Sequence, residues 1–166
     1  HQSGRRQRQM CIRDSGSSST AEAIELVECS LKNGIKKCLA VTPYYNKPSQ
    51  KGLELHYTEL SKVGAEIILY NVPGRTGVDL LPTTIEKLIE IKTIAGIKEA
   101  VNTEERFLAL SKIKDKRQDF QLYSGDDPSY VEFMKFKGDG VISVAANVMP
   151  REIKAVSYTH LTLPTT

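Results

Sequence analysis

The chain has 166 residues, 40% of them hydrophobic and 26% charged, which is ordinary for one globular domain with its own core. No stretch approaches the roughly 18–20 apolar residues that a membrane-spanning helix needs, and the amino end has no apolar segment typical of a signal peptide. The net charge of +3 lies wholly in residues 1–15, where four arginines face one aspartate.

A basic arm can bind nucleic acid through its phosphates, but no aromatic residue or recognition motif accompanies these arginines. We therefore expect neither nucleic acid nor a membrane as a partner. The cysteines Cys11, Cys29 and Cys38 are odd in number and match no metal or redox spacing. Cys29 and Cys38 fall in apolar-periodic segments and are expected to be small core residues, which fits a reducing cytoplasm.

The two ends of the chain lack the pattern of a folded core. Residues 1–15 have no apolar periodicity, and residues 157–166 are polar and rich in threonine. We interpret both as non-native or disordered tails around one domain at residues 16–156. Within that domain, helical patterns lie at 20–32, 50–63, 82–91, 103–114 and 128–137, and strand-like apolar runs at 37–42, 66–71, 94–98, 120–124 and 140–145.

Strands that alternate with helices predict βα units and a parallel sheet. Either a doubly wound open sheet or a (β/α)8 barrel would fit this order. The barrel is favoured because the unusual residues of the chain lie at the carboxyl ends of strands, which meet at one face of a barrel. No glycine-rich phosphate loop follows the first strand, which disfavours a dinucleotide-binding sheet. A complete barrel has eight strands in about 250 residues, so we predict an incomplete one.

Lys98 ends the apolar run AGIKEA at residues 95–100. A lysine that points into a barrel near this rim is partly desolvated, which disfavours the charged amine and lowers its pKa. A neutral amine can condense with a keto acid to form a Schiff base. Alternatively, Lys98 pairs with Glu99 or reaches solvent beyond the strand end. Position alone favours the paired or solvated lysine over the Schiff-base lysine.

Tyrosines and an arginine follow the neighbouring strands. Tyr44 and Tyr45 lie in VTPYYN, and Tyr70 lies in LYNVPGRTG, which also contains Arg75. A phenol can relay the protons that Schiff-base chemistry requires, and a guanidinium can hold a carboxylate with two hydrogen bonds. Taken alone, a tyrosine at a strand end more often packs with its hydroxyl in water, and Arg75 is at least as well explained as a solvated loop residue. Together with a lysine, they favour a Schiff-base aldolase.

Other polar residues have simpler explanations. Asp126 and Asp127 are adjacent carboxylates, but they precede a proline and are expected to cap the helix at 128–137. His56 lies in a helical pattern and His160 in the carboxyl-terminal segment, and neither has neighbours with the spacing of metal ligands. We expect no metal and no organic cofactor.

The segments GSSSTAEAIEL, VTPYYNKPSQKGL, ILYNVPGRTGVDLLP, GIKEA, SGDDP and GVISVAANVMP, in this order and spacing, closely resemble the dihydrodipicolinate synthase family. The resemblance covers about residues 16–156. It implies a (β/α)8 barrel, of which this chain covers about strands 4–8, that condenses pyruvate with aspartate semialdehyde in lysine and diaminopimelate biosynthesis. It also implies a cytoplasmic homotetramer that uses no cofactor.

The resemblance also implies roles for individual residues. Lys98 corresponds to the family's Schiff-base lysine, and Tyr70 to the tyrosine that relays protons to bound pyruvate. Tyr45 corresponds to a tyrosine lent to a neighbouring subunit's active site, and Arg75 to the arginine that binds the semialdehyde's carboxylate.

Four further positions correspond to binding sites of the family. Gly125 and Ile142 match residues that line the pyruvate pocket. Glu22 and Tyr44 match positions of an allosteric lysine site, but Ser18 stands where lysine-inhibited members usually have asparagine. The resemblance therefore leaves feedback inhibition open.

The family's first strands, with a threonine motif that completes the proton relay, and its carboxyl-terminal helical domain have no counterpart in the sequence. We expect the chain on its own to be inactive. N-acetylneuraminate lyases and keto-deoxy sugar acid aldolases share the lysine and tyrosine and are the alternative function. VPGRTG and SGDDP favour the synthase, since sialic acid lyases usually lack that arginine. A non-catalytic domain derived from a barrel is the alternative of another class.

Overall fold

The computed structural model describes residues 12–162 and the side chains of residues 15–159. The strands are β1 (Ile12–Asp14), β2 (Lys37–Val41), β3 (Glu66–Asn71), β4 (Ile94–Glu99), β5 (Gln121–Ser124) and β6 (Gly140–Val141). The helices are α1 (Thr20–Lys32), α2 (Gln50–Ser61), α3 (Pro73–Thr76), α4 (Pro82–Leu88), α5 (Glu104–Lys116), α6 (Tyr130–Lys135) and α7 (Pro150–Thr162), with a 3-10 turn, η1, at Ala145–Asn147.

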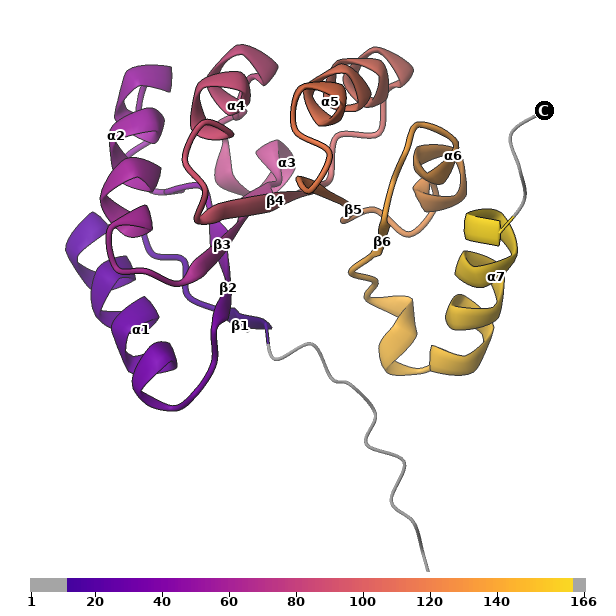
Figure 1. Cartoon of the computed structure of the whole chain (residues 1–166), viewed down its shortest axis with the longest axis horizontal. Helices are drawn as coiled ribbons and strands as arrows, with labels where there is room; N and C mark the ends of the chain where they lie inside the picture. The colour runs from indigo at the N-terminus through magenta and orange to yellow at the C-terminus, as the bar shows by residue number, and fades with distance from the viewer. Residues whose placement is uncertain (1–11, 163–166) are drawn as a thin grey trace, which may run out of the picture.

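All the strands in this range belong to one parallel sheet, and each pairs with the next along the chain in the order β1-β2-β3-β4-β5-β6. Figure 1 shows the strands curving into an open arc, with α1, α2, α4 and α5 on its outer side. A doubly wound sheet would have helices on both faces, whereas one-sided coverage is the arrangement of a barrel segment. The predicted parallel sheet is confirmed.

The core lies between the outer face of the sheet and the helices. Strand residues such as Ile67, Leu69 and Ile97 are fully buried there, together with leucines of α2 and α5. A second, smaller cluster lies on the inner face of the sheet and contains Leu39, Ile68 and Tyr123, with Tyr70, Ala95 and Ile142 packed against it. Both faces of the strands are therefore apolar, as in other parallel sheets that are covered on both sides.

Most predicted elements match the structure to within a few residues, and the differences are local. The segment Pro73–Thr76, which lies in none of the predicted helices or strands, forms the short helix α3. The strand predicted at 140–145 ends at Val141. Cys38 is buried as expected, but Cys29 is exposed on α1, so the prediction of a core residue is wrong there. An apolar period places a residue on a helix face only approximately, and Cys29 lies just outside the buried stripe of α1.

Of the two segments interpreted as tails, residues 1–11 and 163–166 lie outside the described residues. The structure does place Ile12–Asp14 in β1, where this short strand pairs with Lys37–Leu39 of β2. It also places residues 157–162 in helix α7, which runs from Pro150 to Thr162. A three-residue strand is too short to show alternation, which is why sequence patterns did not reveal it. Cys11 lies outside the described range, as does the side chain of His160.

Arg117 holds the amino end of β4 in place. Its Nη1 donates to the carbonyls of Ile89, Ile91 and Ile94 at 2.8–3.1 Å, and Nη2 donates to the carbonyl of Lys92. The same guanidinium pairs with Asp119. One side chain thus satisfies the backbone carbonyls between α4 and β4, at the end of the sheet opposite Lys98.

His56 on α2 is a buried, neutral core residue. Its Nδ1 lies 2.8 Å from Thr20 Oγ1, its ring packs edge-on against Tyr57, and burial lowers its pKa to about 4. Because the unfolded chain binds the proton more readily, stability falls as the pH drops from 6.5 towards 4. The buried carboxyl of Glu99 titrates in the opposite sense: burial raises its pKa to about 7, which favours the folded state as the pH drops from 7 to 4.5.

A His56→Asn variant separates the two effects. We expect the free energy of unfolding of the wild-type chain to fall, relative to this variant, by roughly 3 kcal/mol between pH 7 and pH 4. Urea unfolding of both proteins at several pH values measures the difference. A constant difference across this range would show that His56 is not held neutral by the fold.

Candidate active site

Lys98 and Tyr70 are direct neighbours at the carboxyl ends of β4 and β3. The strands pair Tyr70 with Lys98 in register, and the Lys98 ammonium nitrogen lies 4.1 Å from the centroid of the Tyr70 ring. Lys98 is only 8% exposed. A cation over an aromatic face is held electrostatically, so the tyrosine ring fixes the position of the amine.

Gly125 lies immediately after β5, and because it has no side chain it leaves room for Lys98. A Cβ atom at this position would lie 2.9 Å from Lys98 Cε and 3.2 Å from the Glu99 carbonyl oxygen. The Gly125 N–H donates to that carbonyl at 2.7 Å, which draws the end of β5 against the end of β4. A side chain at this position would have to displace Lys98, so Gly125 shapes the wall beside the lysine.

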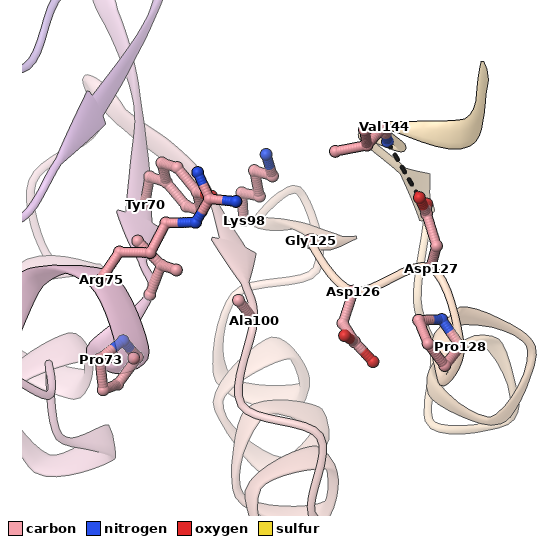
Figure 2. A pocket seen from close by; sticks show the side chains of 12 residues that line it. Tyr70, Pro73, Arg75, Lys98, Ala100, Gly125, Asp126, Asp127, Pro128 and Val144 are labelled. Carbon is pink, nitrogen blue, oxygen red and sulfur yellow. Dashed lines mark hydrogen bonds between the residues drawn. The ribbon is translucent and has the colours of Figure 1, made fainter. Parts of the chain in front are cut away.

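Arg75 reaches the same space from α3. Pro73 begins this single turn of helix, and Gly77 ends it with φ of +68°, a conformation that suits glycine. The turn places the guanidinium beside a cavity of about 530 Å³ that Tyr70, Lys98 and Gly125 also line. Figure 2 shows the side chains of Tyr70, Arg75 and Lys98 pointing into this cavity. The structure thus brings together four of the residues that the sequence singled out.

Asp127 forms the opposite wall of the cavity, and here the expectation of a helix cap is wrong. Helix α6 begins at Tyr130. The Asp127 carboxylate instead accepts a hydrogen bond from the Val144 N–H at 3.1 Å, shown in Figure 2, and another from the Ala145 N–H at 2.9 Å. These bonds turn the chain out of β6, which explains the early end of that strand.

The charge of Asp127 is favoured in this position. Partial desolvation opposes the charge, but the Ser143 hydroxyl, the two backbone N–H groups and the positive charge of Lys98 together lower the pKa of Asp127. Asp126 lines the same cavity and accepts a hydrogen bond from Ser129 Oγ at 2.5 Å. The SGDDP motif therefore supplies carboxylates to the site, a role that the helix-start pattern had hidden.

The other predicted site residues do not line this cavity. Tyr45 is 88% exposed, and Tyr44 is 47% exposed in the same loop. Ile142 packs on the inner cluster beneath the site. Glu22 on α1 accepts a hydrogen bond from Ser17 Oγ at 2.6 Å. The loop that holds both tyrosines is joined to the start of α1 by a bond from Asn46 to the Ser18 carbonyl.

Glu99 does not take part in the cavity, although it follows Lys98 directly. Successive strand residues face opposite sides of a sheet, and Glu99 points outward, where it is 2% exposed. Its carboxylate accepts bonds from Asn71 Nδ2, the Val101 N–H and Arg106 Nη1. The sequence patterns did not predict this buried network. Its only sign in the sequence is that two adjacent strands end in polar pairs, Tyr70-Asn71 and Lys98-Glu99.

Within the residues that the structure describes, no helix is long and apolar enough to cross a membrane. Nor does this part of the chain contain a cluster of three or more histidine, cysteine, aspartate or glutamate side chains arranged to hold a metal ion.

The lysine amine held against a tyrosine ring lies at the carboxyl edge of a curved parallel sheet, where barrel enzymes build their active sites. A comparison with sequence models of protein families identifies the family of the chain. The sequence model of the dihydrodipicolinate synthetase family matches residues 7–160, and the chain belongs to this family.

Individual relatives agree. The chain is 48% identical over 143 residues to the 4-hydroxy-tetrahydrodipicolinate synthase of Buchnera aphidicola subsp. Schizaphis graminum. The matched region covers 86% of this chain and 48% of the relative. Among solved structures, the dihydrodipicolinate synthase of Thermotoga maritima matches with a TM-score of 0.87 at 39% identity, over 90% of this chain and 52% of that one.

The chloride-inhibited dihydrodipicolinate synthase of Acinetobacter baumannii, solved in complex with pyruvate, matches with a TM-score of 0.84 at 42% identity, over 90% of this chain and 51% of that one. The chain therefore spans about half the length of the relatives it matches. The predicted partial barrel and the predicted family are confirmed.

Proposed function

We propose that this chain is the catalytic portion of a Schiff-base lyase that condenses pyruvate with aspartate semialdehyde to 4-hydroxy-tetrahydrodipicolinate. The observation that carries the proposal is the buried Lys98 amine, 4.1 Å from the Tyr70 ring centroid, at a cavity that Arg75 also lines. The names of the relatives and the pyruvate complex of the A. baumannii enzyme support the choice of substrates.

The proposed reaction begins with attack of the neutral Lys98 amine on the keto carbon of pyruvate. Loss of water gives an imine, and removal of a methyl proton gives an enamine, with the Tyr70 hydroxyl relaying protons. The enamine carbon attacks the aldehyde carbon and forms the new C–C bond. The amino group of the semialdehyde portion then displaces Lys98 from the imine carbon, which closes the ring and regenerates the free amine.

The remaining predicted residues have supporting parts in this proposal. Arg75 holds the semialdehyde's carboxylate, and Gly125 and Ile142 shape the pyruvate pocket. Tyr45, exposed on its loop, enters the active site of a neighbouring subunit in a homotetramer. Its 88% exposure supports this role, because a large aromatic side chain suits a protein interface.

The setting of the enzyme belongs to the same proposal. Lysine and diaminopimelate biosynthesis would use its product, and the free thiols of Cys29 and Cys38 suit a cytoplasmic location. Glu22 and Tyr44 would contribute to an allosteric lysine site near the start of α1. Ser18 in place of asparagine weakens the expectation of lysine inhibition.

The proposed activity requires a closed barrel, which can be supplied by a relative. We define the completed barrel as a chimaeric protein in which residues 16–156 of this chain are joined to the segments of the A. baumannii synthase that come before and after them. We expect the completed barrel to consume pyruvate and aspartate semialdehyde, and the 166-residue chain alone to show little or no turnover, because its sheet edges are open. Consumption of each substrate is measured with the purified proteins.

Two results would contradict this proposal. Turnover of both substrates by the isolated chain at a rate near that of the completed barrel would show that closure is unnecessary. A folded completed barrel that forms the pyruvate imine without consuming aspartate semialdehyde would favour an aldolase with another acceptor.

A further inference from the structure

A second pair of residues lies directly behind Tyr70 and Lys98. One position further along the same strands, Asn71 pairs in register with Glu99 on the outer face of the sheet. The Asn71 side-chain amide donates to both Glu99 carboxylate oxygens, at 3.0 and 3.1 Å. Asn71 and Glu99 are 0% and 2% exposed. The cross-strand bonds are therefore shielded from water, where they are stronger than on a surface.

The surrounding elements anchor this pair. Arg106 on α5 contacts Glu99, and it also bonds the Leu80 carbonyl at 2.9 Å and Asp79 at 2.5 Å. Asn71 in turn donates to Asp79 and accepts the Leu80 N–H. The network therefore joins β3, β4, α5 and the loop before α4, and it fixes both partners of the pair.

The pairing of β3 and β4 needs such an anchor because it is irregular at its other end. Ile67 pairs with Ile94, but Ile68 pairs with Gly96, so the register shifts by one residue at Ala95. A slip of one residue turns every following side chain to the opposite face of a sheet. Beyond the shift, a slip of β4 would move Lys98 away from the Tyr70 ring and out of the cavity.

We propose that Asn71 and Glu99 are positioning residues for the Schiff-base lysine: their hydrogen bonds set the register that holds the Lys98 amine over the Tyr70 ring. The proposal rests on the proposed function only for the use made of this amine. Neither residue touches the cavity. They act on the reaction through the strand geometry, and a displacement of about 1 Å at a reacting group can slow a reaction roughly a hundredfold.

Nuclear magnetic resonance of the 166-residue chain tests the register without any substrate. In the wild-type chain, Tyr70 ring protons and the Lys98 side chain should show cross-peaks, and the ring should shift the Lys98 ε-methylene resonance upfield. Glu99→Ala should remove the cross-peaks and move this resonance towards that of the exposed Lys62. Glu99→Gln, which keeps a carbonyl oxygen for Asn71 and Val101, should largely retain both signals.

Arg117→Ala is the matched control, because it removes a partly buried hydrogen-bonded cation from the opposite end of β4. It should destabilise the chain yet preserve the contact between Tyr70 and Lys98. Loss of the contact to the same extent in Arg117→Ala would overturn the proposal, as would an unchanged contact in a folded Glu99→Ala chain. If Glu99→Ala does not fold, Asn71→Ala is the second variant and should lose the contact. If neither variant folds, the network is needed for folding of the whole chain rather than for the position of Lys98, and the proposal is overturned.

The link to catalysis is measured separately in the completed barrel. Borohydride trapping of pyruvate on Lys98 should slow roughly ten- to a hundredfold in Glu99→Ala and recover in Glu99→Gln. If the wild-type completed barrel traps no pyruvate while the spectroscopic results hold, the proposed function fails and the positioning role stands.

Discussion

Replacement of Lys98 by methionine in the completed barrel is expected to abolish the borohydride-stable pyruvate adduct. Methionine fills nearly the same volume but has no amine, so no imine can form. We expect turnover to fall by roughly 10⁴-fold or more, as is usual when a covalent nucleophile is removed. The fold should remain intact, because the substitution places an apolar side chain at a buried position.

The measurement is mass spectrometry of the protein after treatment with pyruvate and borohydride, followed by peptide mapping. Lys62→Met is the control, since Lys62 is an exposed lysine at the end of α2. It should leave both the adduct and the turnover unchanged. An adduct of normal yield in Lys98→Met, or its location on another lysine of the wild-type protein, would refute the role of Lys98.

Replacement of Tyr70 by phenylalanine should separate the two functions of this side chain. The aromatic ring remains and can still hold the Lys98 amine, but the hydroxyl that relays protons is lost. We expect turnover to fall by roughly 10²–10⁴-fold, the usual contribution of a general acid or base. The pyruvate adduct should still form, more slowly than in the wild type, because imine formation itself requires proton transfer.

Turnover and the rate of borohydride trapping, measured on the same preparations, check this prediction. Tyr123→Phe is the matched control: Tyr123 pairs in register with Lys98 from β5, on the side away from Tyr70, and packs in the inner cluster without lining the cavity. It should leave turnover within a fewfold of the wild type. Equal losses in the two variants would indicate a general effect on the inner cluster rather than proton relay by Tyr70.

Several features of the site were predictable because they depend on strand ends alone. The carboxyl ends of parallel strands meet at one edge, so Tyr70 and Lys98 could be expected to lie close together. Arg75 could be placed at the same edge because it follows β3 by only a few residues. The motifs around these residues also resemble one family, and the family comparison confirms that resemblance.

Other features depend on contacts between segments distant in sequence. Asp127 was expected to start a helix, but it binds the backbone near Val144, 17 residues away. Glu99 was considered as a partner for Lys98, yet it bonds Asn71, 28 residues earlier in the chain. No local pattern reports such pairings, since each depends on how the strands and loops come together. The catalytic and binding roles of the predicted site residues all stay predictions: Lys98, Tyr70, Arg75 and Gly125, as well as Tyr45, Ile142, Glu22 and Tyr44.

The amino-acid sequence by itself determined the alternation of strands and helices, the parallel sheet and the family, because apolar periodicity and motif order are local properties of the chain. Only the tertiary structure decided which way Lys98 and Glu99 face. Neighbouring strand residues point to opposite sides, and a shift of one residue exchanges them. The register of β4 against β3, with its irregularity at Ala95 and its hydrogen-bonded pair at Asn71 and Glu99, places the amine in the cavity and the carboxylate behind it.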